Sequence, residues 1–195
     1  MAGGTLFCFG SAQLTHHTKD KELIGNLMYY HKSMGLLLAG LLVPRLLVRI
    51  VSRKPPHLPS SMVEKYAANL THWMTYGFLF GLSGTGIMMG YYSGYGFPFF
   101  LTVIPGLPLE EKRGDLAGFG YKLHKYQGAA LEYLIALHVS AVVFNHTIGR
   151  NVLGRITSPA MVPLLVLPYM GIAVAASYSV DTKEHPDFPR ALPKF

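Results

Sequence analysis

The chain has few charged residues and a single cysteine among its 195 residues. Charged residues make up 14% of it, well below the quarter or so that soluble domains carry, and half of the chain is hydrophobic. With Cys8 alone, an internal disulfide framework is excluded. The net charge of +7 comes without a basic run, a zinc-ligand spacing or an RNA-binding signature, so nucleic acid is not an expected partner. The composition instead favours one domain embedded in a lipid bilayer.

Four apolar stretches predict membrane-spanning helices. The expected fold is therefore all-α, an integral membrane bundle of about four transmembrane helices at residues 27–179. A polar and apolar N-terminal tail at 1–26 and a C-terminal tail at 180–195 flank it. The expected spans cover about residues 27–51, 67–92, 121–147 and 160–178.

The charges between the spans predict an orientation. Loops 51–66 and 148–159 carry five Lys or Arg residues against one acidic residue, whereas loop 92–121 carries two against three. Because short loops rich in Lys and Arg stay on the cytoplasmic or matrix side, the first two loops are expected there. Both termini then lie on the outer side of the membrane.

Histidines inside these spans are the candidate site residues. His124 and His138 lie fourteen residues apart, so both fall on one helix face, about 21 Å apart along its axis. His31 lies about one turn inside its span from the same side as His124, and His72 lies near the inner side, as His138 does. The pairs His31 with His124 and His72 with His138 can therefore each meet at one depth. Each histidine could simply hydrogen-bond within the bundle, but a pair at equal depth is also what clamping a haem iron requires.

Three segments carry motifs of a known family. MYYHKSMGLLLAGLLVPRLLVRIV resembles the second helix of the prokaryotic cytochrome b561 family, which is related to the b-type cytochrome subunits of membrane hydrogenases. NLTHWMTYGFLFGLSGTGIMMGYYSG resembles its third helix, and KLHKYQGAALEYLIALHVSAVVFNH its fourth. The resemblance covers roughly residues 28–159 and implies quinone-linked electron transfer through haem b.

The resemblance also implies which histidines bind iron. The outer haem b would be held axially by His31 and His124, and the inner haem by His138 together with a histidine of the family's first helix. Because no apolar span precedes residue 27, we expect that helix and its ligand to be absent. His72 is the remaining candidate partner of His138. One haem b is therefore expected, and the second is left open.

Two functions of different kinds follow. The first is a membrane haem b protein that passes single electrons, quinone-linked or within a respiratory assembly, and is an electron carrier rather than a stand-alone enzyme. The second is a haem-free or haem-vestigial structural subunit of a large bioenergetic complex, with other membrane subunits as partners. Both place the chain in an energy-transducing membrane, the mitochondrial inner membrane or a bacterial plasma membrane. Glu132, near mid-membrane, could hydrogen-bond a neighbour or line a quinone or proton path.

Overall fold

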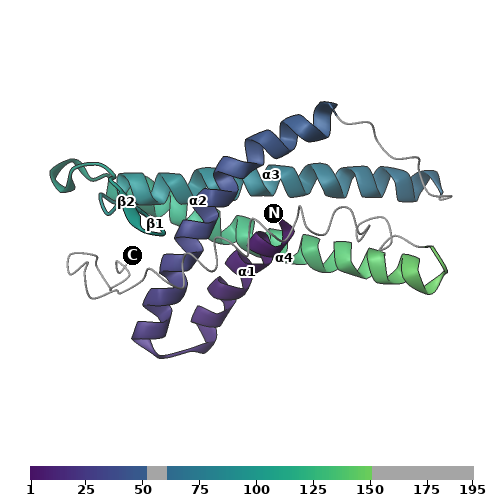
Figure 1. Ribbon diagram of the computed structural model, residues 1–195, viewed down its shortest axis with the longest axis horizontal. Coiled ribbons are helices and arrows are strands. Elements are labelled where there is room, and N and C mark those ends of the chain that lie inside the picture. The colour runs from purple at the N-terminus through teal and green to yellow at the C-terminus, as the bar shows by residue number, and fades with distance from the viewer. Residues whose placement is uncertain (52–60, 151–195) are drawn as a thin grey trace.

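The computed structural model describes residues 1–51 and 61–150, which form long helices and one small hairpin sheet (Figure 1). The elements are, in order, α1 (Ala2–His17), α2 (Lys21–Val51), α3 (Met62–Tyr92), β1 (Phe97–Phe99), β2 (Thr102–Ile104), the short 3-10 helix η1 (Leu109–Glu111) and α4 (Gly114–Thr147). The expected span at 160–178 and the expected C-terminal tail lie outside the described residues.

The three expected spans that fall within the described residues each form one helix, and each helix begins five to seven residues earlier than expected. Polar caps mark two of the three starts, whereas Arg113 at the start of α4 makes no side-chain cap. The Asp20 side chain accepts hydrogen bonds from the backbone amides of Glu22 and Leu23 at the start of α2. Ser61 and Glu64 form a reciprocal capping box at the start of α3. Hydropathy marks the apolar middle of a helix, whereas capping decides where the backbone starts to coil.

Helix α1 corrects the expectation of an N-terminal tail at residues 1–26. Residues 2–17 form a helix that packs along α2, and its buried residues, Gly4 and Ser11, are small. At 1.5 Å per residue, α1 is roughly 24 Å long, shorter than the apolar thickness of a bilayer. Its sequence resembles a tail because its apolar start, residues 1–10, is too short to cross a bilayer.

The helices form two hairpins that cross. Helix α1 runs back along α2, α3 and α4 lie side by side in opposite directions, and α2 passes across α3 (Figure 1). At one end, Arg150 follows α4 and forms an ion pair with Glu64 in the first turn of α3, with 2.9 Å between Nη1 and Oε2. The sheet lies at the opposite end of α3. Histidines on different helices can therefore meet at two separate depths of the bundle.

Strands β1 and β2 form an antiparallel hairpin where a long loop was expected. The hairpin is fastened to α2 by Ser33, whose hydroxyl donates to the Pro98 carbonyl at 3.1 Å and accepts from the Phe100 amide at 3.2 Å. The Tyr29 hydroxyl also donates to the Phe100 carbonyl. These contacts hold the hairpin against the same stretch of α2 that carries His31.

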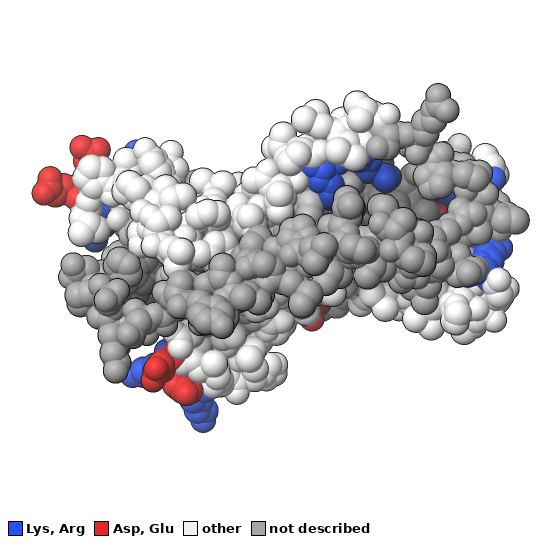
Figure 2. Space-filling model, in the orientation of Figure 1, with Lys and Arg blue, Asp and Glu red and all other residues white. Residues whose placement is uncertain are grey.

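Most large apolar side chains of the described residues face outward. Leu47, Val51, Trp73, Tyr126 and Tyr133 are all exposed, which in a membrane protein is the surface that meets lipid. Among the described residues, α2 and α4 are long and apolar enough to cross a membrane. In Figure 2 the charged side chains visible on this face form a few separate groups, and most of the described surface is uncharged. The structure is thus a helical bundle suited to a bilayer, and the count of four spans stays a prediction.

Candidate haem-binding histidine pairs

His31 on α2 and His124 on α4 face each other, as their matching depths predict. Their ring centroids are 6.2 Å apart and the ring planes are inclined by 75°. Each residue lies about ten positions from the start of its helix, and both helices start at the same end of the bundle. Helices α2 and α4 are not consecutive in the chain, so the pairing of consecutive antiparallel helices would not bring these two histidines together. The crossing of α2 over the α3–α4 hairpin sets this contact instead.

The Nδ1 atom of His31 is hydrogen-bonded to α1. Its Nδ1 lies 2.8 Å from the Cys8 carbonyl oxygen and 3.4 Å from the Ser11 hydroxyl. Because a carbonyl oxygen can only accept, Nδ1 carries the hydrogen and donates it. The other ring nitrogen, Nε2, then keeps its lone pair, which is the form of histidine that binds a metal.

His124 is held in the same way by α3. Its Nδ1 lies 3.1 Å from the Leu82 carbonyl oxygen and 3.1 Å from the Thr85 hydroxyl. Gly81 of α3 faces α4 here, and a Cβ at that position would lie 2.7 Å from Nε2 of the Gln127 side chain. His124 therefore also has its Nδ1 hydrogen engaged and its Nε2 lone pair available.

The separation of the two rings fits a six-coordinate haem iron. Two metal–nitrogen bonds of about 2 Å, with roughly 1 Å from each nitrogen to its ring centre, place two opposed imidazoles about 6 Å apart. The centroids of His31 and His124 are 6.2 Å apart. Among the described residues, no group of three or more His, Cys, Asp or Glu side chains is placed to hold a metal ion.

His72 on α3 and His138 on α4 form a second pair. Their ring centroids are 5.7 Å apart and the planes are inclined by 66°. Both residues are exposed, and Arg49 of α2 lies nearby with its guanidinium 5.8 Å from the centre of the Tyr76 ring. Within the part of the chain that the structure describes, neither imidazole of this pair is hydrogen-bonded to a backbone carbonyl. The two pairs thus have similar distances between their rings, but only the imidazoles of the first pair are hydrogen-bonded to helix carbonyls.

Glu132 lies on α4 between His124 and His138, and its carboxylate accepts a hydrogen bond from the Gln13 side chain of α1 at 3.1 Å. Of the roles that its sequence position left open, the structure therefore provides the first, a hydrogen bond to a neighbouring helix. The carbonyl and hydroxyl groups around His31 and His124 have no counterpart among the sequence predictions. The one available sign was the run of small residues in GLSGTG, which permits close helix packing.

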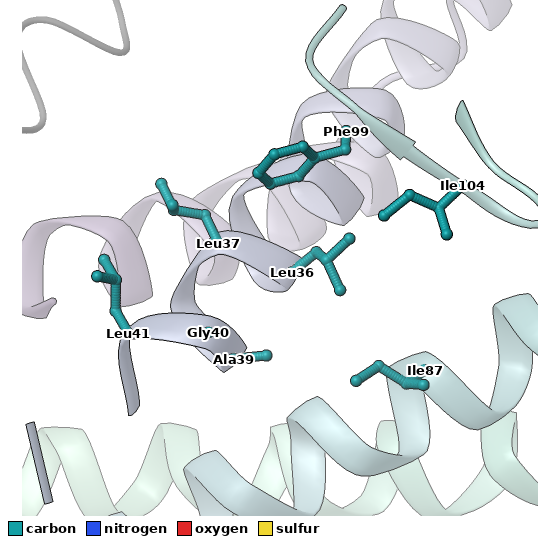
Figure 3. A pocket seen from close by; sticks show the side chains of 8 residues that line it. All are labelled: Leu36, Leu37, Ala39, Gly40, Leu41, Ile87, Phe99 and Ile104. Atoms are coloured by element: carbon teal, nitrogen blue, oxygen red, sulfur yellow. The ribbon is translucent and has the colours of Figure 1, made fainter. Parts of the chain in front are cut away.

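An apolar groove lies between α2, Ile87 of α3 and the hairpin (Figure 3). Its volume is about 520 Å³, and five of its residues come from α2, one from α3 and two from the hairpin strands. All of the side chains that line it are apolar or absent. They are Leu36, Leu37, Ala39, Gly40, Leu41, Ile87, Phe99 and Ile104. A groove of this kind accepts hydrocarbon and offers no side-chain hydrogen bond.

Comparison with known proteins agrees with these features. No curated protein matches the chain. Residues 1–159 match the family described as prokaryotic cytochrome b561, which confirms the resemblance drawn from the histidine-bearing segments and extends it through α1. That family implies haem b, an integral membrane location and electron transfer. The chain therefore belongs to the prokaryotic cytochrome b561 family and is a membrane b-type cytochrome.

Proposed function

We propose that His31 and His124 are the axial ligands of one haem b, through which the protein passes single electrons. The observation that carries this is the opposition of two imidazoles whose Nδ1 atoms are both committed to helix carbonyls. This arrangement leaves an Nε2 lone pair on each ring, as axial ligation requires. A bound haem supplies a reversible one-electron iron couple, and the chain's own groups orient the two rings.

A second haem b between His72 and His138 extends the proposal. Support comes from the 5.7 Å separation of their rings. The two pairs share α4, on which His124 and His138 are separated by about 21 Å along the axis. Two sites at different depths would let an electron move across most of the bilayer, from the end with the hairpin to the end with the Glu64–Arg150 ion pair. In the orientation expected from the loop charges, this direction runs inward.

Quinone is the redox partner that we propose for the first site. The groove in Figure 3 begins five residues after His31 and is lined by apolar side chains only, which suits the prenyl tail of a quinone. Its lining gives no hydrogen bond to a quinone head, so the head would lie outside the groove. Attachment to a respiratory assembly is compatible with this role, because the outward apolar faces of α2 and α4 are open to neighbouring subunits.

Visible spectroscopy of the purified protein tests the haem proposal. A dithionite-reduced minus oxidised spectrum should show the α band of a b-type cytochrome. His31→Ala and His124→Ala should each remove the same haem component, because one remaining imidazole cannot supply both axial bonds. His146→Ala is the matched control, since this exposed histidine lies in the last turn of α4. Lack of an α band in the unaltered protein would instead favour the structural-subunit alternative.

The quinone proposal has its own test. Gly40 borders the groove, and a Cβ added at this position would have no neighbouring atom within 4 Å, so Gly40→Leu adds apolar volume at the groove from an open position. We expect slower haem reduction by a prenylated quinol and an unchanged haem spectrum. Gly77→Leu is the control, because Gly77 has equally free space and lies outside the groove. If the quinol reduced the haem equally fast in Gly40→Leu and Gly77→Leu, the groove would be excluded as the quinol site.

A further inference from the structure

The hydroxyl beside His124 is placed to accept a hydrogen bond. Thr85 is 7% exposed, and its Oγ1 lies 3.1 Å from Nδ1 of His124. The same oxygen lies 2.8 Å from the Gly81 carbonyl, its shortest contact, and 3.2 Å from the Leu82 carbonyl. Because a carbonyl can only accept, the hydroxyl hydrogen points to one of these backbone oxygens. The hydroxyl lone pairs then remain for the Nδ1 hydrogen of His124.

The same device recurs at His31 on a different helix. Ser11 is 5% exposed, its hydroxyl donates to the Cys8 carbonyl at 2.9 Å, and its Oγ lies 3.4 Å from Nδ1 of His31. At both histidines, the ring nitrogen meets a helix carbonyl and a hydroxyl three residues later: Cys8 with Ser11 on α1, and Leu82 with Thr85 on α3.

We propose that Thr85 and, more weakly, Ser11 are positioning residues that set the electron-donating strength of the two axial histidines. This inference rests on the proposed ligation of haem by His31 and His124. A histidine whose Nδ1 hydrogen is bound more strongly is a stronger donor at Nε2, and it favours oxidised iron and so lowers the midpoint potential.

The distances rank the two hydroxyls. At His124, the hydroxyl and the carbonyl lie equally far from Nδ1, at 3.1 Å, so loss of the hydroxyl removes one of two equal acceptors. At His31, the carbonyl at 2.8 Å is much closer than the hydroxyl at 3.4 Å and remains after the hydroxyl is lost. Removing the Thr85 hydroxyl should therefore change the haem more than removing the Ser11 hydroxyl.

The test measures the midpoint potential and haem retention of the haem component that His124→Ala abolishes. Thr85→Val keeps the shape of the side chain without its hydroxyl, and should raise the potential and weaken haem binding by roughly 10-fold or more. Thr85→Ser restores the hydroxyl and should restore the potential. Ser11→Ala should give a smaller rise. Thr75→Val is the control, because the Thr75 hydroxyl donates to the Thr71 carbonyl of the same helix at 2.8 Å, as Thr85 does to Gly81.

Each outcome decides. If Thr85→Val keeps the native midpoint potential and its full haem content, the inference is overturned. It is also overturned if Thr85→Ser shifts the potential as much as Thr85→Val does, since the hydroxyl would then not be the cause. If Thr85→Val loses its haem, retention at the native potential in Thr85→Ser supports the inference and loss in both overturns it. Full haem retention in His124→Ala would instead refute the ligand assignment of the proposed function. Haem loss in His124→Ala with no effect of Thr85→Val would refute the present inference alone.

Discussion

Ser33 offers a quantitative test of how the hairpin is held on the bundle. The Ser33 side chain is fully buried, with an exposed fraction of 0%, and it makes two hydrogen bonds to the hairpin, one as donor and one as acceptor. Ser33→Ala would leave the Pro98 carbonyl and the Phe100 amide without these partners. At about 1 kcal/mol for each hydrogen bond, the change should weaken hairpin docking by about 2 kcal/mol.

Hydrogen exchange measures this local effect. A loss of about 2 kcal/mol corresponds to roughly a 30-fold rise in the opening equilibrium, since 1.4 kcal/mol is a factor of ten. Amides of the hairpin, residues 97–104, should exchange faster by about this factor, whereas amides in the middle of α4 should not change. The Phe100 amide itself is excluded from the comparison, because it loses its own acceptor.

Ser140→Ala is the matched control for this experiment. The Ser140 hydroxyl is exposed and bonds to the Ala136 carbonyl of its own helix, so hairpin exchange should stay at the native rate. Unchanged hairpin exchange in Ser33→Ala would refute the reasoning, because it would mean that the two hydrogen bonds contribute nothing to docking. An equal rise along α4 would also refute it, since the effect would then be global.

Three further predictions concern stability in detergent. Gly96→Ala should unfold the turn before β1, because Gly96 has a φ of +68° and an added Cβ would overlap the Ile104 carbonyl; faster proteolysis of the hairpin would report it. Leu42→Ala removes a side chain that is 1% exposed and should cost about 2–5 kcal/mol in denaturant unfolding; a cost below 1 kcal/mol would contradict tight packing there. Glu64→Gln breaks the partly exposed ion pair with Arg150, keeps a side chain that can close the capping box with Ser61, and should cost at most about 1 kcal/mol by the same assay; a larger loss would show that the pair is more than a surface contact.

The pairing of the histidines was predictable because the depth of each histidine in the bundle depends only on its position in its helix and on the direction of that helix. The rise of 1.5 Å per residue and the alternation of helix direction fix the depth of each residue within a membrane bundle. His31 and His124 meet on these grounds, and so do His72 and His138. The sequence leaves the second site open because the histidine that the family resemblance pairs with His138 is expected to be absent, and depth alone does not fix the rotation that would turn His72 toward it. Rotation depends on the packing of all neighbouring helices.

The support around the histidines could not be predicted in the same way. Cys8 contributes its backbone carbonyl, which any residue at that position would also provide, so the residue type carries no signal. Thr85 bonds to carbonyls of its own helix, as many threonines in apolar helices do. Its contact with His124 exists only because α3 and α4 pack closely at this point, which the residue type does not reveal. Helix α1 and the hairpin escaped prediction for a similar reason, since their positions depend on contacts with α2.

In the proposed two-haem arrangement, the haems at the two histidine pairs are expected to differ in midpoint potential, and the difference would set a direction for electron flow. At the first pair, hydrogen bonds from both Nδ1 atoms to carbonyls would strengthen the proposed ligands and lower the potential of their haem. At the second pair, the cationic Arg49 is close enough to His72 to interact with it electrostatically. A positive charge favours the reduced iron and raises the potential. Electrons should therefore pass downhill from His31 and His124 toward His72. Redox titration should resolve two steps, with His72→Ala removing the higher one; removal of the lower step would reverse the assigned direction.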